Sequence, residues 1–318
     1  MKMNRIQFQP GMSFDQLHTE YGTERQCQEA LELRRWPTGF HCPKCHSLRH
    51  GIYWRKDLKI FQCRDCRTQT TLTEGTIFHS TKLPLTKWFQ AIYVLTQTKN
   101  NVASLELMRF LGVCYKTAWR VKHKIMQMQH ERELATKLSG RVEVDDAYLG
   151  GELPGGKAGR GSENKEPFVA AVQTNENGHP LYAVFFPVTT FSREEIAAFA
   201  RQSLVSGTTV VSDGLWCFKA VEEAGCFHQR EVVGKKRKST DMECFTWINT
   251  ILGNLKTAIT GTYHHFNFDK YRHRYLSEYQ YRFNRRFDLA GMFVRLLTAA
   301  AQTGKRPEAW LRLAEDWR

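Results

Sequence analysis

Four cysteines stand in two matched pairs, Cys42-Pro-Lys-Cys45 and Cys63-Arg-Asp-Cys66, with seventeen residues between the pairs. Each pair has the spacing of a tight turn that presents two thiolates. Two such turns can close a tetrahedral shell around one Zn²⁺ ion. The spacing therefore predicts a structural zinc ribbon, which is too small to be the whole protein.

Two aspartates in the second half of the chain have the positions of metal ligands. Asp145 lies in a predicted strand, 142–148, and Asp213 directly follows another, 208–212. If the two strands are neighbours, the carboxylates converge on a divalent cation, because Mg²⁺ is hard and prefers oxygen ligands. Such a site can activate a water or a 3′-hydroxyl for in-line phosphoryl displacement.

Asp146 competes with Asp145 for the same metal. Alternation along the strand puts Glu143 and Asp145 on one face and Asp146 on the other. We therefore expect that one of the two adjacent aspartates faces the ion.

A third ligand is expected from a late helix. Asn249 and Lys256 are seven residues apart, so they fall on nearly the same helical face. The amide oxygen of Asn249 can bind Mg²⁺, and Lys256 can contact DNA phosphate or the bases beside the scissile bond. Glu243 is the alternative carboxylate, although it points away from that face.

The apolar patterns predict the elements that must position these residues. Residues 13–34 read as one short helix capped by Ser13, and 51–55 with 59–62 as a hairpin. Residues 69–78 are predicted to form a third strand or the segment that leads out of the hairpin.

Three helical segments between 84 and 129, with a turn at Gly112, suggest a helix-turn-helix-like arrangement. Any three-helix bundle would give the same pattern.

From residue 141 the pattern changes to strands and helices. Strands are predicted at 142–148, 168–174, 181–188, 208–212 and about 230–233, with helical segments at 193–204, 215–223 and from about 241. Three strands followed by alternating helices and strands is the order of a ribonuclease-H-like α/β domain.

The composition bounds the class of protein. The chain has 318 residues, 42% of them hydrophobic, and a net charge of +14. Such a charge favours a polyanion, most commonly nucleic acid, with an anionic membrane surface as the alternative. We see no secretory signal and no apolar run near the roughly 18 residues of a spanning helix. The five cysteines outside the zinc spacing are scattered, so we expect a cytoplasmic protein, associated with the nucleoid when bound to DNA.

Several motifs resemble one known family over most of the chain. They are Arg35-Trp36-Pro37 with the ribbon, Val142-Glu-Val-Asp145, Tyr148-Leu-Gly-Gly151, Gly159-Arg160-Gly161, Ser212-Asp213-Gly214, Gly261-Thr-Tyr-His-His265 and Tyr281-Arg-Phe-Asn-Arg-Arg286. The chain resembles bacterial insertion-sequence transposases of the DDE superfamily, in the ISXO-like class with an amino-terminal zinc ribbon.

The resemblance implies a metal triad of Asp145, Asp213 and Asn249 for Mg²⁺ or Mn²⁺, with Lys256 as its companion. Many members have glutamate at the position of Asn249, and a subset has asparagine with the lysine seven residues on.

The resemblance also implies that the protein binds the inverted ends of its element, nicks them by hydrolysis and joins the freed 3′-hydroxyls to target DNA. Double-stranded DNA is then the partner, bound by a homodimer or larger assembly, and no membrane partner is expected.

Two basic segments are expected to contact phosphate, since they accompany a predicted phosphoryl-transfer site. These residues are Lys235, Lys236, Arg237, Lys238, Lys256, Arg282, Arg285 and Arg286. A solvated charged face is the alternative for such runs.

Two alternatives to a transposase remain open. One is a catalytically inactive DNA-binding regulator derived from a transposase, which Asn249 favours because it replaces a charged ligand. The other is a metal-dependent nuclease that cuts DNA without joining it. Retention of Asp145, Asp213 and Lys256 favours the enzyme.

The predicted organisation is multidomain. It comprises an amino-terminal helical segment (1–35), the zinc ribbon (36–80), a helix-turn-helix-like segment (81–135), the ribonuclease-H-like domain (138–290) and a carboxy-terminal helical tail (291–318).

Overall fold

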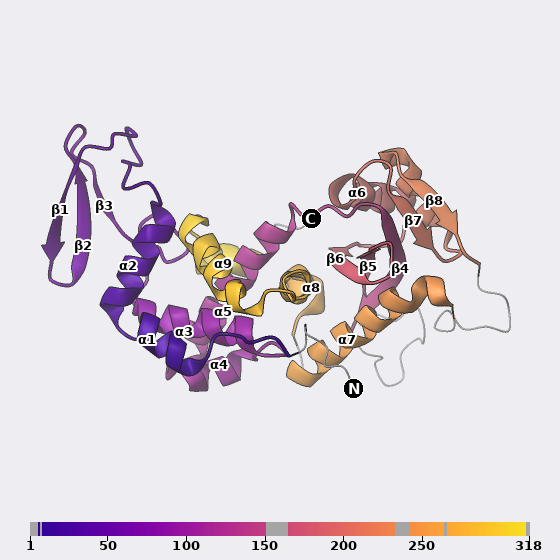
Figure 1. The fold of residues 1–318 in the computed structure, drawn as a ribbon, viewed down its shortest axis with the longest axis horizontal. Helices are drawn as coiled ribbons and strands as arrows, with labels where there is room; N and C mark the ends of the chain where they lie inside the picture. The colour runs from indigo at the N-terminus through magenta and orange to yellow at the C-terminus, as the bar shows by residue number, and fades with distance from the viewer. Residues whose placement is uncertain (1–5, 7, 151–164, 233–241, 264–265, 316–318) are drawn as a thin grey trace. The chain divides into compact units, whose positions relative to one another are not determined.

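The computed structural model describes residues 6, 8–150, 165–232, 242–263 and 266–315. The chain divides into two compact units (Figure 1). The first unit takes in Met1–Met128 and Phe287–Leu313, and the second Gln129–Arg286 and Ala314–Arg318. Among the described helices, none combines the length and apolar character that crossing a membrane requires.

The first unit joins a small sheet to a group of helices. Its elements are α1 (Phe14–Tyr21), α2 (Glu24–Arg35), β1 (His50–Arg55), β2 (Leu58–Cys63), β3 (Gln69–Thr71), α3 (Leu85–Gln97), α4 (Ser104–Leu111), most of α5 (Tyr115–Glu133), α9 (Leu289–Gln302) and α10 (Glu308–Leu313). Helix α9, in the segment expected to be a carboxy-terminal tail, packs against α2 and α3.

The single helix predicted for 13–34 is wrong, because the chain forms two helices there. Ser13 and Gln16 make one capping box, in which each side chain bonds the other's backbone N–H. Thr23 and Gln26 make a second one at the start of α2. A new cap at Thr23 restarts the helix because it satisfies N–H groups that a continuous helix would have bonded internally.

The predicted hairpin is confirmed. Strands β1, β2 and β3 form an antiparallel sheet in that order. Phe61 of β2 packs beneath it against Trp36 and Phe40, with ring centroids 4.7 and 5.0 Å away. These aromatic contacts give the ribbon a small core of its own.

Three helices occupy 84–129, as the pattern predicts. Gly112 ends α4 with φ of +63°, a left-handed conformation that favours glycine, and its N–H bonds back to the helix. Helix α5 begins three residues later. Its first residues, Tyr115 and Lys116, are exposed, whereas Val121 to Met128 are buried.

The second unit contains a mixed sheet and its covering helices. Its elements are β4 (Arg141–Leu149), β5 (Glu166–Thr174), β6 (Pro180–Pro187), α6 (Arg193–Ser203), β7 (Thr209–Ser212), the 3₁₀ helix η2 (Trp216–Ala224), β8 (Phe227–Arg230), the 3₁₀ turn η4 (Glu243–Phe245), α7 (Thr246–Thr262) and α8 (Phe268–Asn284). The predicted strands are confirmed, except that β8 begins about three residues earlier than expected.

The strand order of this sheet is β6-β5-β4-β7-β8. The pairs β6–β5 and β5–β4 are antiparallel, whereas β4–β7 and β7–β8 are parallel. Strand β4 is therefore central, with β7 beside it.

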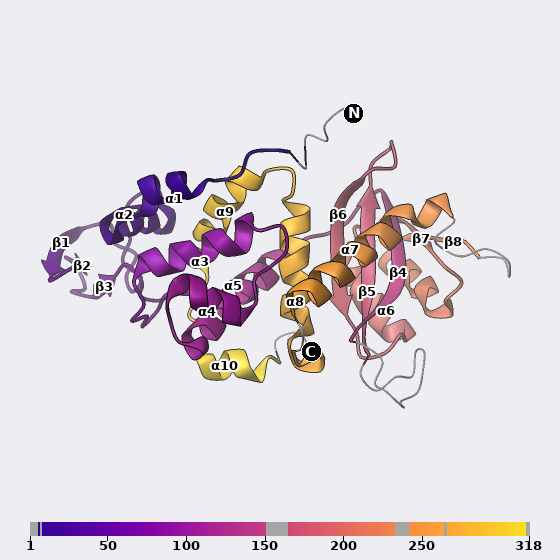
Figure 2. The ribbon, with the colours of Figure 1, turned by 90° about the horizontal axis from the view of Figure 1, so that it is seen from below.

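The two faces of β4 pack against different helices. Val142 and Val144 lie in a buried cluster with residues of α6 and η2. Helix α7 packs on β4 and β5, and Figures 1 and 2 show it crossing the sheet on the side opposite α6. Alternation therefore turns Glu143 and Asp145 toward the α7 side.

Helix α8 and its end cover the free edge of strand β6. Asn284 accepts from the backbone N–H of Ala183 at 2.8 Å and donates to its carbonyl at 3.0 Å. Gln280 accepts from the backbone N–H of Phe185 at 2.9 Å. Side-chain amides thus stand where a sixth strand would bond, which is one way of protecting a sheet edge.

Candidate active site

The carboxylates of Asp145 and Asp213 meet beside the paired inner strands β4 and β7 of the second unit's sheet. Strands β4 and β7 are parallel, and their register ends with Val144 opposite Ser212. The next residue in the chain after each of these is an aspartate, so the pairing itself brings the two side chains together. Oxygens of Asp145, Asp146 and Asp213 all lie within 4.8 Å of one another.

Asp146 belongs to this acidic cluster, so the expectation that only one adjacent aspartate approaches the site is corrected. Consecutive Cα atoms are only 3.8 Å apart. Two adjacent side chains that leave opposite faces of β4 can therefore still bring oxygens close to a third carboxylate that follows the neighbouring strand. The donor set is three carboxylates, which suits a hard divalent cation.

Backbone hydrogen bonds hold two of the carboxylates. An oxygen of Asp145 accepts from the N–H of Asp146 at 2.9 Å, and one of Asp213 from the N–H of Leu215 at 2.9 Å. Burial, reinforced by the negative charges of Asp146 and Asp213, raises the pKa of Asp145 to about 7. The repulsion behind this shift is what a bound cation would relieve.

Glu143 fixes helix α7 to strand β4. This residue is 1% exposed. One carboxylate oxygen accepts from the backbone N–H groups of Trp247 and Ile248, at 3.1 and 2.9 Å. The other accepts from Arg141 at 2.9 Å. A buried carboxylate thus satisfies two N–H groups in the first turn of α7, where the helix dipole favours negative charge.

Sequence reasoning missed this function of Glu143. Alternation assigned Glu143 to the face of Asp145, but its partners on α7 are more than one hundred residues away in the chain. The sole signal in the sequence was a carboxylate inside a strand whose other residues are mostly apolar. Such a residue needs a buried partner.

Helix α7 carries the other two predicted site residues. Lys256 is near enough for its charge to lower the pKa of Asp145, against the larger effects that raise it. The amide nitrogen of Asn249 donates to the carbonyl of Phe245 at 2.9 Å. Because the amide nitrogen of Asn249 is a donor, the side-chain oxygen is the atom of Asn249 that can bind a hard cation. Glu243, the alternative ligand, lies in η4, and its side chain is outside what the structure describes.

The four predicted zinc ligands come together in the first unit. Their sulfurs lie within 4.8 Å of one another, with Cys42–Cys66 at 3.4 Å and Cys45–Cys63 at 3.5 Å. Four sulfurs around Zn²⁺ at about 2.3 Å would be separated by about 3.8 Å. The cluster therefore fits a tetrahedral structural zinc.

The two cysteine turns share a backbone feature. The residue after each pair, His46 or Arg67, has a positive φ of 60° or 61°. The N–H of the first cysteine of each pair bonds to a carbonyl five residues on, in Ser47 or Thr68. Two similar hydrogen-bonded turns thus hold the four thiols close together.

The predicted phosphate contacts divide into two groups. Lys235, Lys236, Arg237 and Lys238 lie outside the described residues. The later arginines make contacts inside the second unit: Arg282 with Glu278, Arg285 with Glu133, and Arg286 with the carbonyls of Pro180 and Leu181. A phosphate would have to compete with these partners.

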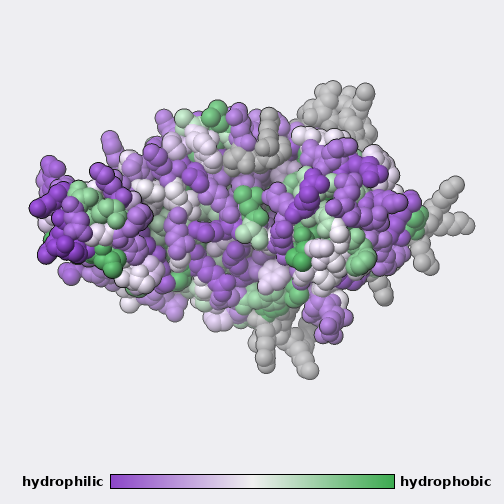
Figure 3. Space-filling view, turned by 90° about the horizontal axis from the view of Figure 1, so that it is seen from above, coloured by the Kyte–Doolittle hydropathy of each residue, from purple (hydrophilic) through white to green (hydrophobic). Residues whose placement is uncertain are grey.

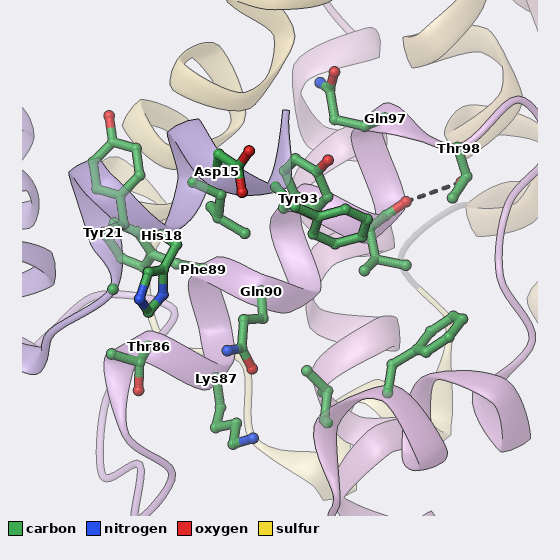
Figure 4. A pocket seen from close by; sticks show the side chains of 16 residues that line it. Asp15, His18, Tyr21, Thr86, Lys87, Phe89, Gln90, Tyr93, Gln97 and Thr98 are labelled. Atoms are coloured by element: carbon green, nitrogen blue, oxygen red, sulfur yellow. Dashed lines mark hydrogen bonds between the residues drawn. The ribbon is translucent and has the colours of Figure 1, made fainter. Parts of the chain in front are cut away.

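A groove of about 720 Å³ lies between α1, α3 and α4 in the first unit (Figure 4). Aromatic side chains, among them Tyr21, Phe89 and Tyr93, line it. Asp15 is its one acidic lining residue. The groove thus lacks the clustered carboxylates or thiols that mark the two sites above.

Comparisons with known proteins match both halves of this description. Residues 137–284 match the model of the ISXO2-like transposase domain. Residues 22–69 match that of the transposase zinc-ribbon domain. The chain is also 28% identical, over 233 residues, to an uncharacterized protein in transposable element ISH50 of Halobacterium salinarum, covering 66% of this chain and 74% of that relative. The matched regions contain the cysteine cluster and the acidic cluster.

Proposed function

Because the chain belongs to the ISXO2-like transposases with an amino-terminal zinc ribbon, we propose that it cleaves the ends of an insertion sequence and joins them to target DNA. The reaction is a divalent-metal-dependent phosphoryl transfer in the second unit. The observation that carries this proposal is the meeting of Asp145, in the middle of β4, with Asp213, which directly follows the adjacent parallel strand β7.

The second unit has a ribonuclease-H-like fold in this proposal. Three antiparallel strands followed by two parallel ones, in the order β6-β5-β4-β7-β8, support it. So does the position of the acidic cluster, which lies where the central strand β4 passes the end of its parallel neighbour β7. Ligands in open α/β sheets bind outside the carboxyl ends of strands, and Asp213 lies at that end of β7.

Asp145, Asp213 and Asn249 would hold the metal, with Asp146 beside them. A bound Mg²⁺ or Mn²⁺ supplies Lewis-acid activation of the attacking water or 3′-hydroxyl and neutralises charge on the leaving oxygen. Lys256, whose cationic field reaches Asp145, attracts the phosphate beside the scissile bond. Glu143 positions α7, and with it both Asn249 and Lys256.

The first unit recognises the element ends in this proposal. The zinc ribbon and the helix pair α4–α5, joined at Gly112 as in a helix-turn-helix, would supply the surfaces that contact DNA. The exposed start of α5, at Tyr115 and Lys116, supports that role, since recognition helices contact bases with their first residues. A homodimer or larger assembly then holds two ends together.

A second candidate is a DNA-binding regulator without catalytic activity. Asn249 favours it, because a neutral amide takes the position of the family's usual carboxylate. A regulator binds element ends without metal and never cuts them. A nuclease that cuts without joining shares the site and differs in its product.

The test is strand transfer by the purified full chain on labelled element ends, with Mg²⁺ or Mn²⁺. The variants are Asp145→Asn, Asp213→Asn and Asn249→Ala, and the exposed turn residue Glu176 provides the matched control, Glu176→Gln. We expect the wild type and the control to join ends to target. The three site variants should bind the ends but fail to join them.

Other outcomes identify the alternatives. Binding by the wild type without cutting under either metal ion supports the regulator. Cutting without joining supports the nuclease. In the first case, recovery of cutting by Asn249→Glu would show that the missing charge is the cause.

A further inference from the structure

A second basic surface lies in the first unit, separate from the residues expected above to contact phosphate. It is a groove of about 700 Å³ between the loop 79–83, α5 and the segment that leads into α10. Five cationic residues line it: Lys82, Arg120, Lys124, Lys305 and Arg306. Glu308 is the one carboxylate among its lining residues. We call this the basic groove.

The buried side of the basic groove is formed by Lys124. This residue is 7% exposed, and its ammonium donates one hydrogen bond, to the carbonyl of Ile77 at 2.7 Å. An ammonium has three N–H donors. Burying such a cation is costly unless an anion or further acceptors accompany it.

The rim offers further donors. Lys82 and Lys305 are exposed, and within the described residues neither side chain makes a hydrogen bond or ion pair. His79 accepts the N–H of Gly75 at Nδ1, at 3.1 Å. In its neutral form this histidine therefore carries its proton on Nε2, which makes that nitrogen a donor.

Glu308 shows what kind of ligand suits the groove. Its carboxylate lies 3.4 Å from Nε of Arg120, 3.9 Å from Nζ of Lys116 and 3.0 Å from a guanidinium nitrogen of Arg312. An anionic group of the chain itself thus stands between the basic groove and the exposed start of α5. A phosphate would find the same cations at the same place.

We propose that the basic groove binds the phosphate backbone of duplex DNA, and that Glu308 competes with phosphate for Arg120 and Lys116. The inference rests on the proposed function, because it takes DNA as the partner. It adds a binding site beside the second helix of the α4–α5 pair. If the first residues of α5 contact the bases of a duplex, the phosphates of one strand of that duplex would lie along this groove. Figure 3 shows that hydrophilic residues predominate on the face that it draws, and the net charge of the chain is +14, which favours a polyanion as the partner.

The experiment measures binding of a fluorescent element-end duplex to the full zinc-loaded chain, in EDTA-free buffer without Mg²⁺ or Mn²⁺, over a series of salt concentrations. The variants are Lys82→Gln, Lys305→Gln and their combination. Lys219→Gln, an exposed lysine of the second unit, loses the same charge elsewhere. Each groove variant should weaken binding about two- to fivefold. Each single variant should also lower the slope of log K against log[salt] by about one, and their combination by about two.

Glu308→Gln tests the competition in the opposite direction. It should tighten DNA binding and increase the salt slope, since Arg120 and Lys116 become available to phosphate. Thermal melting of each variant checks that the chain is folded. Groove variants that match Lys219→Gln in both affinity and slope would overturn the proposal, and so would a wild type that does not bind the duplex.

Failure of this inference can be told apart from failure of the proposed function. Strand transfer by a wild type whose groove variants bind normally refutes the basic groove alone. If those variants bind DNA more weakly but the wild type does not cut it, the proposal for the basic groove is supported, and the protein is better described as the regulator.

Discussion

The carboxylate of Glu143 lies 2.9 Å from the backbone nitrogen of Ile248, although 105 residues separate the two in the chain. Strand β4 carries Asp145 two residues beyond Glu143, and α7 carries Asn249 one residue beyond Ile248. One buried carboxylate therefore sets the distance between the two elements that supply the proposed metal ligands.

Replacing Glu143 with glutamine should loosen α7 without removing any ligand. The amide keeps an acceptor but loses the charge that faces the helix N-terminus and Arg141, so we expect a loss of about 1–3 kcal/mol in the free energy of unfolding. Strand transfer and Mn²⁺ affinity should fall, while metal-free DNA binding stays unchanged. Urea unfolding, calorimetric metal titration and the DNA-binding assay measure the three effects. Unchanged metal affinity in a destabilised Glu143→Gln would argue against a positioning role.

Removing zinc should unfold the ribbon and spare the second unit. Structural zinc contributes folding free energy directly, and its ligands hold the ends of the β1–β2 hairpin. A chelator should therefore release about one Zn²⁺ per chain and abolish hydrogen-exchange protection in 50–63, with protection in β4 and β5 retained. Cys63→Ser should behave in the same way. Cys114→Ser, at an exposed cysteine outside the cluster, should keep its zinc, and a ribbon that stays protected after zinc loss would contradict the prediction.

DNA affinity should fall as the pH rises from 7 to 9. Burial, with a smaller effect from the charge of Arg120, lowers the pKa of Lys124 to about 8. A base with this pKa is cationic below pH 8 and loses its charge above it, so the attraction for phosphate is present at pH 7 and lost by pH 9. Other cationic groups that line the basic groove near Lys124 are Arg120 on α5 and Lys82 and Lys305 on the rim.

The size of this effect should be on the order of tenfold, as for one hydrogen bond between charged groups. Anisotropy titrations at fixed ionic strength measure it. Lys124→Met should bind more weakly at pH 7 and show a flatter pH profile. A wild-type profile as flat as that of Lys124→Met would refute the prediction.

Asn284→Ala should uncover the edge of β6. It removes both hydrogen bonds to the peptide group of Ala183, and each buried group left unpaired costs about 1–3 kcal/mol. Urea unfolding should register the loss, and the amide of Ala183 should exchange faster. Asn284→Asp is the matched comparison, since aspartate can accept from the N–H of Ala183 but cannot donate to its carbonyl. Equal stability of the alanine variant and the wild type would contradict this account.

The parts of the site that depend on local spacing could be predicted from the sequence. The four cysteines lie in two short turns, Asp145 lies within a largely apolar strand and Asp213 directly follows another. Short windows of sequence therefore carry the signal. Parallel pairing of β4 with β7 then brings the aspartates together. The closeness of Asp146 was missed because alternation describes the direction of side chains and not the reach of adjacent carboxylates.

The rest depends on contacts between distant segments. Nothing near Glu143 in the sequence indicates that it meets α7. Arg286 reads as a phosphate contact by its charge, yet it donates to carbonyls of β6 more than one hundred residues away. The break between α1 and α2 could have been predicted, because Thr23 and Gln26 repeat the capping box of Ser13 and Gln16.

The covered edge of β6 limits how copies of this protein can associate. Asn284, Gln280 and Arg286 already bond the backbone groups that an incoming strand would use. Two chains brought together on DNA thus cannot merge their sheets through β6 into one continuous sheet. Crowding on a DNA molecule carries little risk of fibrous polymerisation along that edge, and self-association must use side chains on other surfaces.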